Sequence, residues 1–498
     1  MKNRSTPDEL FNKQGYISLS SYVDDIYHMR TNGPWKLPMG HRDRIVLFWA
    51  KVILRFSWFR NNLYVKYPYT WSPSYSILLS FLGKKGALDT CVERSLQHPG
   101  LFSFTVTKQL MYGDTSKKLY GNGVSEHAST ALSKAIGEML EREITGLKDS
   151  NNDVITDCIN NLGIKGDVLN PAQFHRFLPQ QKKHFPELGV NNDTVISWVS
   201  GENLITNKKV FIPRHMTSWF FARKESSNIF SNPTTNGSAL AFTKEEATTR
   251  GILEVVQRDA FFVHWLTGVP PNVIDQKTLS KDLRESVSLY EARGITLYIL
   301  NTMTNILIPS VCVVAINREA AVRGIAISAA SAFSFEEAIR DSLREMAVCS
   351  QTLSEELAPI DDVEPFISDL DKSTRLAYLR GEKRVNECMW FVSGESIPFD
   401  GLEKYTIENK SKDVAGELRS CLSILEKMGK DYYPVVYYPQ NALQKDLGFF
   451  IAQVFIPKAF PLYLIEKFGT FDSNRLHEFA KYKGHKEWKI TKTPHMFT

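Results

Sequence analysis

Two helical segments carry polar side chains at a spacing that could hold a metal ion. Glu138 and Glu141 are three residues apart in the first segment, and Glu254 and Gln257 repeat that spacing in the second. Residues three apart share one face of a helix, and two carboxylates placed so repel each other unless a cation lies nearby. Mg²⁺ accepts one or two carboxylates together with phosphate oxygens and water. The alternative for an isolated pair is a solvated helix face.

The second segment favours a metal or phosphate site, because its glutamate stands in an apolar stretch. Residues 252–262 are mostly apolar around Glu254, and a buried carboxylate needs a partner or a metal. The guanidinium of Arg258 can make paired bonds to phosphate oxygens. The alternative is a structural ion pair between Arg258 and a glutamate.

A weak internal repeat links these segments to a third. Each has an alanine seven residues before a glutamate and follows a stretch with glycine or serine that we predict to be a loop. The helical segments are 131–138, 247–254 and 338–345, and the predicted loops are 120–125, 235–238 and 327–331. Alanine and glutamate are common helix formers, so the shared order is compatible with duplication without proving it.

The Gly121-Asn122-Gly123 sequence precedes the first helix, and its glycines would let backbone approach a phosphate closely. It is not a Walker A loop, because no Gly-Lys-Ser/Thr follows. The sequence also lacks HExxH, GxSxG and protein-kinase signatures, so it gives no support for those enzyme classes.

Runs rich in β-branched and aromatic residues predict strands between the helices. They cover residues 296–300, 310–316, 433–438 and 449–456. Helices alternating with strands predict a mixed α/β core. Residues 350–385 are acidic and polar, and we predict a surface helix and linker there.

Composition and charge limit the classes of protein to which this chain can belong. The chain has 498 residues and a net charge of +5 from 60 basic and 55 acidic residues, a small excess that does not call for nucleic acid. The six cysteines form no CxxC pair, which argues against a zinc site or a disulfide framework. We find no apolar signal core at the N-terminus and no apolar run long enough for a membrane span, and expect a cytoplasmic protein.

Residues 1–95 are rich in aromatic and basic side chains, and 44–60 read as an amphipathic helix with Arg44, Lys51 and Arg55 on one stripe. This segment could dock a partner or a membrane surface, or pack on the core with snorkelling cations. We predict an N-terminal extension at 1–95, a catalytic domain at 96–470 and a tail at 471–498 that reaches the active site.

Taken together, these motifs resemble the YcaO superfamily over roughly residues 95–470. The resemblance rests on Gly121 and Gly123, then segments 135–142 (AIGEMLER), 236–239 (NGSA), 245–247 (EEA), 254–260 (EVVQRDA) and 329–345. It implies a YcaO-like ATP-binding fold of mixed α/β type, with internally repeated loop-helix-strand units and the N-terminal extension.

The resemblance also implies roles for individual residues, with ATP and Mg²⁺ as cofactors. Metal ligands would be Glu138, Glu141, Glu254 and Gln257. Nucleotide contacts would come from Gly121, Asn122, Gly123, Ser125, Asn236, Glu246 and Arg258. Arg258 and the terminal Thr498 would be catalytic.

The implied reaction acts on a ribosomally made, bacteriocin-like precursor peptide. A Cys, Ser or Thr side chain attacks the preceding carbonyl, ATP phosphorylates the resulting oxygen, and loss of phosphate leaves a thiazoline or oxazoline. A separate E1-like protein would bind the leader, a flavin dehydrogenase could follow, and a homodimer is compatible with the family. The alternatives are thioamide or amidine formation on the same scaffold, and a non-catalytic scaffold protein.

Four positions depart from the family pattern. Asn122 stands where lysine is frequent, Phe242 where asparagine is common, and Gln257 where the second helix has its second glutamate. The family's Pro-x-Pro-x-Pro tail is reduced to Pro494. These departures motivate the non-catalytic alternative, because fewer anionic ligands weaken Mg²⁺ binding.

Overall fold

The computed structural model describes most of the chain beyond residue 88. The described residues are 16–18, 64–66, 89–94, 100–112, 115–146, 154–219, 233–317, 324–354, 357–360, 363–408, 413–441, 444 and 448–497. The predicted helix at 44–60 and the terminal Thr498 lie outside them. The predicted division at residues 95 and 470 stays a prediction.

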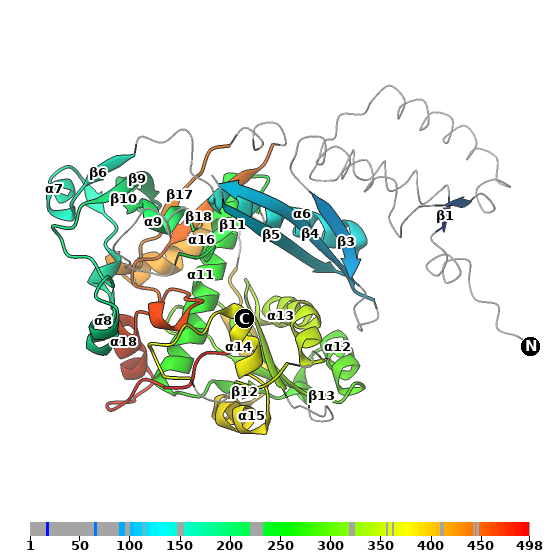
Figure 1. The fold of residues 1–498 in the computed structure, drawn as a ribbon. Helices are drawn as coiled ribbons and strands as arrows, with labels where there is room; N and C mark the ends of the chain where they lie inside the picture. Colours follow the sequence, from blue (N-terminus) through cyan, green and yellow to red (C-terminus); the bar gives the residue numbers. More distant parts are fainter. Residues whose placement is uncertain are drawn as a thin grey trace, which may run out of the picture. The chain divides into compact units, whose positions relative to one another are not determined.

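The chain divides into two compact units, which are described in turn. The first comprises residues 1–95, 102–140 and 442–449, and the second comprises 96–101, 141–441 and 450–498. Figure 1 labels many of the helices and strands of both units.

The first unit contains an antiparallel three-stranded sheet and most of one long helix. The strand order is β3 (Thr90–Arg94), β4 (Phe102–Tyr112) and β5 (Thr115–Ser125), and the helix is α6 (Ala128–Gly146). Two short strands, β1 (Tyr16–Ser18) and β2 (Tyr64–Lys66), form a separate antiparallel pair.

In its described residues, the second unit contains three sheets. The largest has the order β11 (Ser238–Ala241), β18 (Phe450–Phe455), β17 (Val435–Tyr437), β9 (Ile196–Asn203), β10 (Lys209–Pro213) and β7 (Asp167–Val168), with β6 (Ile155–Asp157) beside β9. The second has the order β15 (Gly324–Ser331), β14 (Ser310–Asn317), β13 (Ile295–Asn301), β12 (Asn272–Ile274) and β16 (Ser396–Ile397). The third pairs β19 (Asp472–Ser473) with β8 (His175–Arg176).

Helices pack on these sheets. The α-helices of the second unit are α7 (Ile159–Gly163), α8 (Pro179–His184), α9 (Arg214–Thr217), α11 (Lys244–Thr267), α12 (Lys281–Glu291), α13 (Phe335–Cys349), α14 (Lys372–Tyr378), α15 (Glu382–Cys388), α16 (Val414–Lys427) and α18 (Asn474–Tyr482). Short 3₁₀ turns are η1 (Pro171–Gln173), η2 (Gln276–Thr278), η3 (Ser350–Ser354), η4 (Met389–Val392), η5 (Asp400–Tyr405), η6 (Lys430–Tyr432) and η7 (Glu466–Phe468).

Helix α11 is the central element of the second unit, because its two halves belong to different cores. Its first half packs Ile252 and Val256 with Val454 of the seven-stranded sheet. Its second half packs Phe261 and Trp265 in a cluster that includes residues of β14 and β15. Figure 1 shows α11 extending from the region of β11 and β18 toward the second sheet. Side chains along α11 therefore sit where the two sheets come together.

The predicted strands and the three helices of the repeat are present, but two of the three predicted loops are wrong. Residues 120–125 and 327–331 lie in strands β5 and β15, and Ser238 begins strand β11 after a turn. The repeated unit is therefore a strand, a short turn and a helix. The alanines of the repeat are fully buried (Ala131, Ala247 and Ala338), which explains why a small residue recurs there.

The prediction of a surface helix and linker at 350–385 is also wrong in its second half. Arg375 and Tyr378 of α14 are buried, with 0% and 3% of their surface exposed. The Arg375 guanidinium donates to the carbonyl oxygens of Leu370, Leu464 and His495. It also pairs with the buried Glu466 carboxylate at 3.4 Å. Polar composition did not predict burial here because these distant acceptors satisfy the charged side chain.

The two glycines of β5 make the close approach of α6 possible. A Cβ atom at Gly121 would lie 2.0 Å from the carbonyl oxygen of Ala135, and one at Gly123 would lie 1.9 Å from that of Ala131. Real Cβ atoms are not found so close to backbone oxygen. Glycine therefore has a packing role here, whatever else binds nearby.

This packing gives a stability prediction. We expect Gly123→Ala to lower the free energy of unfolding by at least the roughly 1–3 kcal/mol typical of overpacking, measured by urea unfolding without nucleotide. Gly401→Ala is the matched control, because nothing lies within 4 Å of the added methyl group. Equal stability of the two variants would contradict the packing role.

Candidate functional site

The predicted metal ligand Glu254 is held by a glycine turn. The Gly237 N–H donates to Glu254 Oε2 with an N···O distance of 3.1 Å. Gly237 has φ +81°, and a Cβ atom there would lie 2.2 Å from the carbonyl oxygen of Val454. Only glycine fits this turn, so β18 and the turn together direct one N–H at the Glu254 carboxylate.

Arg258 lies one helical turn beyond Glu254 and is loosely paired with it. The closest nitrogen–oxygen distance is 3.7 Å, longer than a hydrogen bond. The guanidinium carbon is 4.4 Å from the ring centroid of Phe497, and the buried Nε atom has no hydrogen-bond partner. Arg258 therefore keeps donor capacity for an anion beside Glu254.

Asn236, which precedes the glycine turn, has a buried side-chain oxygen without a hydrogen-bond partner. A buried, unsatisfied acceptor costs free energy and is a group that a cation can use. With the Glu254 carboxylate on the other side of Gly237, the residues here offer oxygen donors of the kind that Mg²⁺ prefers. These residues fit the cation that the sequence implies.

Gln257 is fixed by a different sheet. Its Nε2 atom donates to the carbonyl oxygen of Ala329 in β15, at 2.7 Å. The amide nitrogen is committed by this bond, so Oε1 is the atom that could accept a bond or coordinate a metal. Glutamine lacks the charge of the glutamate that the family has at this position. Its amide nitrogen, however, donates a hydrogen bond that a carboxylate could not donate.

Glu246, the predicted nucleotide contact, lies in the first turn of α11. Its backbone N–H donates to the capping side chain of Thr243 at 3.1 Å, and its carboxylate pairs with Arg250 at 2.5 Å. Burial and the nearby Glu246 and Glu337 carboxylates raise the pKa of Glu417. The Glu246 carboxylate therefore acts on Glu417 of α16.

In the first unit, Glu138 makes a bond like that of Glu254. Its Oε2 atom accepts a hydrogen bond from the backbone N–H of Asn122 in β5. The Asn122 side chain in turn accepts from Thr105 Oγ1 at 2.8 Å. In both repeats a helix glutamate thus accepts from the backbone of the preceding strand or turn.

The remaining predicted residues of the first helix lie close by in the chain. Ser125 ends β5 and is buried, and its Oγ accepts from the His127 N–H at 3.3 Å. Glu141 lies one turn beyond Glu138 and is half-buried. Glu138 belongs to the first unit and Glu254 to the second.

The second unit therefore brings together Glu254, Arg258 and the Gly237 turn, and adds Phe497, which the sequence did not single out. Within the described ranges, no three or more His, Cys, Asp or Glu side chains form a group that could hold a metal ion. A cation that shares its coordination with phosphate needs only one or two carboxylates.

A buried ion pair supports the site from the next residue of α11. Asp259 and Arg475 of α18 are both fully buried, and their closest nitrogen–oxygen distance is 2.6 Å. Burial opposes the charge, yet the Asp259 carboxylate raises the pKa of Arg475 above its ordinary value. Asp259 also accepts from the Phe460 N–H at 2.8 Å. Sequence reasoning missed this pair because 216 residues separate its members.

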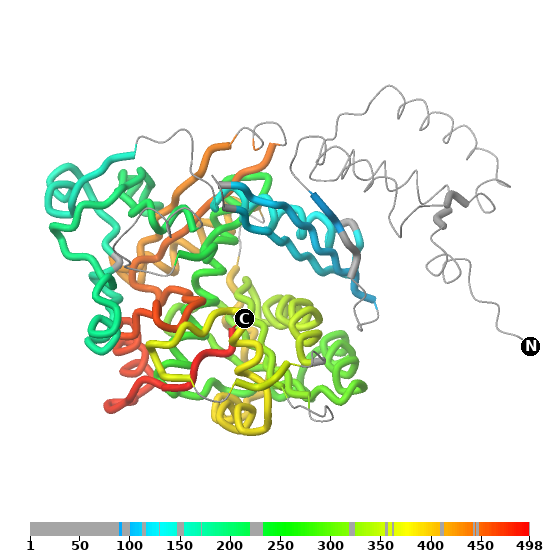
Figure 2. Tube along the Cα trace, viewed as in Figure 1, coloured from blue at the N-terminus to red at the C-terminus, as the bar shows by residue number. Residues whose placement is uncertain are grey.

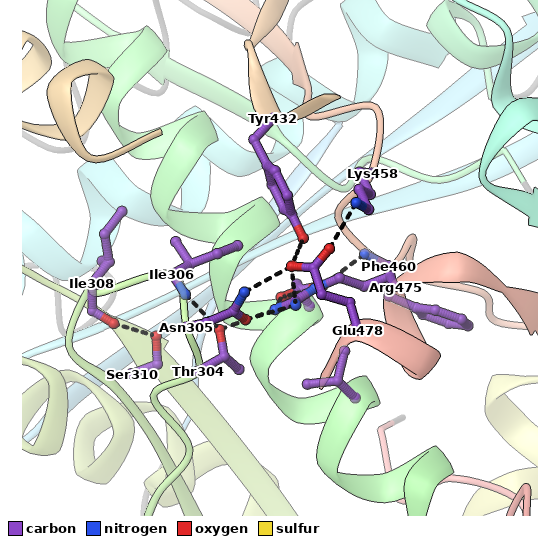
Figure 3. A network of polar contacts seen from close by, with 12 residues as sticks. Thr304, Asn305, Ile306, Ile308, Ser310, Tyr432, Lys458, Phe460, Arg475 and Glu478 are labelled. Atoms are coloured by element: carbon purple, nitrogen blue, oxygen red, sulfur yellow. Dashed lines mark hydrogen bonds and ion pairs between the residues drawn. The ribbon is translucent and has the colours of Figure 1, made fainter. Parts of the chain in front are cut away.

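Arg475 extends the ion pair into a larger network, shown in Figure 3. Its guanidinium donates to Asn305 Oδ1 at 2.7 Å. Glu478 accepts from Asn305 and from the Tyr432 hydroxyl, and pairs with Lys458 at 2.7 Å. The network ties α11 and α18 to the loops before β14 and after β18.

The family model described as YcaO cyclodehydratase, ATP- and Mg²⁺-binding, matches residues 120–459, more than half of the chain, and the chain belongs to this family. The family assignment and the mixed α/β fold predicted from the sequence are confirmed. So are the ATP-dependent enzyme class and ATP and Mg²⁺ as cofactors. A search of curated proteins found no match.

Solved structures share the fold at low identity. A heterocyclase in complex with substrate and cofactor has a TM-score of 0.65 at 16% identity, covering 82% of this chain and 55% of that one. YcaO from Methanopyrus kandleri bound with AMPPCP and Mg²⁺ has a TM-score of 0.55 at 15% identity, covering 78% and 91%. The heterocyclase TruD has a TM-score of 0.54 at 15% identity, covering 73% and 50%. The chain thus spans about half the length of the two heterocyclases.

As for membranes, none of the helices in the described ranges has the length and apolar character needed to cross one.

The buried ion pair gives a stability prediction. Asp259→Asn leaves the buried Arg475 with only its longer ion pair, to Glu478 at 3.5 Å, so we expect the free energy of unfolding to fall by about 3–5 kcal/mol. In the control, Asp472→Asn, the pair with Arg176 is more than a third exposed on both sides, and the expected loss is below about 1 kcal/mol. Urea unfolding measures both, and similar losses would contradict the assignment.

Buried histidines give a pH prediction. Burial lowers the pKa of His175 to about 4 and that of His264 to about 3, against about 6.5 in an unfolded chain. The unfolded state therefore binds more protons below pH 6.5. Stability should be full above that pH and should fall toward pH 4, by up to about 1.4 kcal/mol per pH unit for each histidine.

Urea unfolding between pH 7.5 and 4.5 measures this slope. His175→Gln should flatten it by about one proton, whereas His485→Gln, at an exposed position, should leave it unchanged. An unaltered slope in His175→Gln would contradict the prediction.

Proposed function

We propose that this chain uses ATP to activate a backbone amide of a ribosomally made precursor peptide, cyclodehydrating Cys, Ser or Thr residues to thiazolines or oxazolines. Family membership supports the ATP-dependent class. The observation that carries the proposal is the pairing of Glu254, fixed by the Gly237 N–H at 3.1 Å, with Arg258, whose Nε lacks a partner. This arrangement offers a cation ligand and an anion ligand one helical turn apart.

The family resemblance assigns Mg²⁺ to Glu138, Glu141, Glu254 and Gln257. In the second unit, Glu254 and the Gln257 Oε1 atom would hold it, and the Asn236 Oδ1 atom is a further oxygen that the cation could use. Bound Mg²⁺ would neutralise charge on the transferring phosphate. The hydrogen bond from the Gly237 N–H orients the Glu254 carboxylate. Residues Gly121, Asn122, Gly123, Ser125 and Glu246 stay proposed nucleotide contacts.

Arg258 would act on the phosphate oxygens. Its guanidinium lies beside Glu254 without a close hydrogen bond to it, so binding an anion would cost little rearrangement. During phosphoryl transfer to the peptide oxygen, negative charge spreads over the equatorial oxygens, and a fixed guanidinium stabilises it. When phosphate departs, the thiazoline or oxazoline ring remains. Each ring formed therefore consumes one ATP and lowers the peptide mass by one water. Thr498 stays a proposed catalytic residue.

Partner proteins are part of the proposal. We propose that an E1-like protein binds the leader of the precursor. The two heterocyclases that share the fold extend well beyond the matched region, with 55% and 50% of their length covered. A bacteriocin-like product, a flavin dehydrogenase and a homodimer stay predictions.

The test starts with nucleotide binding, which needs no precursor. Isothermal titration of the full chain with Mg²⁺ and AMPPCP should show binding, and Glu254→Gln should weaken it at least about tenfold, or 1.4 kcal/mol. Glu285→Gln is the control, because this surface glutamate pairs with Lys281 only at 3.7 Å. Absence of binding by the wild type would support a non-catalytic scaffold instead.

The second step identifies the reaction by mass spectrometry of a Cys/Ser/Thr-rich precursor peptide incubated with ATP. Loss of one water per modified residue, with release of phosphate, is the expected result. Exchange of oxygen for sulfur would show thioamide formation and overturn the cyclodehydratase assignment.

A further inference from the structure

The C-terminal segment, residues 491–497, runs along α11 from its C-terminal end toward Arg258. The Thr491 N–H donates to the carbonyl oxygen of Leu266 at 2.9 Å, and the Trp265 indole donates to that of Thr493 at 3.0 Å. Further along, the His495 ring contacts Phe262 at 4.9 Å and the Phe497 ring contacts Phe261 at 4.5 Å between centroids. Figure 2 shows this segment in red, running toward the end marked C. Each step brings the segment closer to Arg258.

His495 fixes the segment through both ring nitrogens. Nε2 lies 3.0 Å from the carbonyl oxygen of Tyr463, and Nδ1 lies 3.1 Å from the backbone nitrogen of Phe497. A carbonyl only accepts and an N–H only donates, so the ring must carry its proton on Nε2. The His495 carbonyl also accepts from Arg375 at 3.1 Å. Three bonds thus hold one residue that is 0% exposed.

The ring of Phe497 forms the surface on which Arg258 rests. It is buried and stands edge to face with Phe261, at an interplanar angle of 87°. The Arg258 guanidinium lies 4.4 Å from its centroid, within the range of a cation–π interaction. The ion pair to Glu254 is long, at 3.7 Å, so the ring is a second contact that restricts the guanidinium.

We propose that His495 and Phe497 are positioning residues for Arg258: His495 locks the C-terminal segment, and the Phe497 ring holds the guanidinium at the angle from which it binds phosphate. The segment keeps only Pro494 for backbone stiffness, so the histidine bonds supply the rigidity. The inference rests on the proposed function, because it assigns phosphate binding to Arg258. A guanidinium held in place before binding loses less side-chain entropy when phosphate arrives.

A double-mutant cycle tests the coupling, with affinity for Mg²⁺ and AMPPCP as the readout. Phe497→Leu removes the ring and keeps an apolar side chain, and we expect about fivefold weaker binding. Phe497→Tyr retains the ring and should stay within about twofold of the wild type. In an Arg258→Lys background, which already binds more weakly, Phe497→Leu should add little, because coupled residues are not additive.

Phe391→Leu is the matched control for lost packing. Phe391 contacts Phe261 at 5.5 Å, in the same aromatic cluster as Phe497. Its loss should lower the melting temperature without changing nucleotide affinity. His495→Ala should weaken binding as Phe497→Leu does, and the two changes together should be less than multiplicative. If Phe497→Leu does not fold, Phe497→Met replaces it in the cycle.

The outcomes separate this inference from the proposed function. Wild type that binds nucleotide, with Arg258→Lys weaker and Phe497→Leu unchanged, would overturn the positioning role and leave the function standing. Full additivity of the two single changes would also overturn it. Wild type that binds no nucleotide would overturn both.

Discussion

The buried pair of Asp259 and Arg475 is the interaction on which the second unit depends. It joins the middle of α11 to α18, and through the Phe460 N–H it also fixes the segment that follows β18. Two full charges without water are tolerated only because every side of the pair is hydrogen-bonded: Thr304 and Asn305 take the remaining guanidinium donors. Arg258 is the preceding residue on the same helix, so the pair sets the rotation and depth at which Arg258 is presented.

Helix α11, fixed by this ion pair, carries the residues of the candidate site. Its first half is packed on the seven-stranded sheet and its second half in the cluster that includes β14 and β15, and Glu254, Gln257 and Arg258 lie near the changeover. Each is oriented by a different element: Glu254 by the Gly237 turn, Gln257 by the Ala329 carbonyl of β15, and Arg258 by the ring of Phe497. Three distant parts of the sequence thus converge on one turn of helix.

The sequence predicted what repeats locally. The alanine-to-glutamate spacing located α6, α11 and α13, and β-branched runs located β13, β14, β17 and β18. It misplaced Gly121 and Gly123, because glycine marks both loops and strands that another backbone approaches closely. It could not find Asp259 with Arg475, or Arg258 with Phe497, since nothing in the chain marks pairs so far apart. It placed Arg375 at the surface because its acceptors, backbone carbonyls and the Glu466 carboxylate 91 residues away, leave no local mark in the sequence.

The observed contacts show that the departures from the family pattern affect the candidate site less than the sequence alone suggests. Asn122 lacks the lysine charge, yet it binds Glu138 through its backbone N–H, which any residue but proline supplies. Gly237 does the same for Glu254 in the second repeat. Gln257 lacks a carboxylate, but its amide nitrogen bonds to β15 while Oε1 remains for coordination. The elements that orient the candidate ligands are therefore largely backbone, and the substitutions change the charge of the site more than its geometry. A site with fewer anionic ligands depends more on phosphate to hold the metal, so metal and nucleotide should bind together.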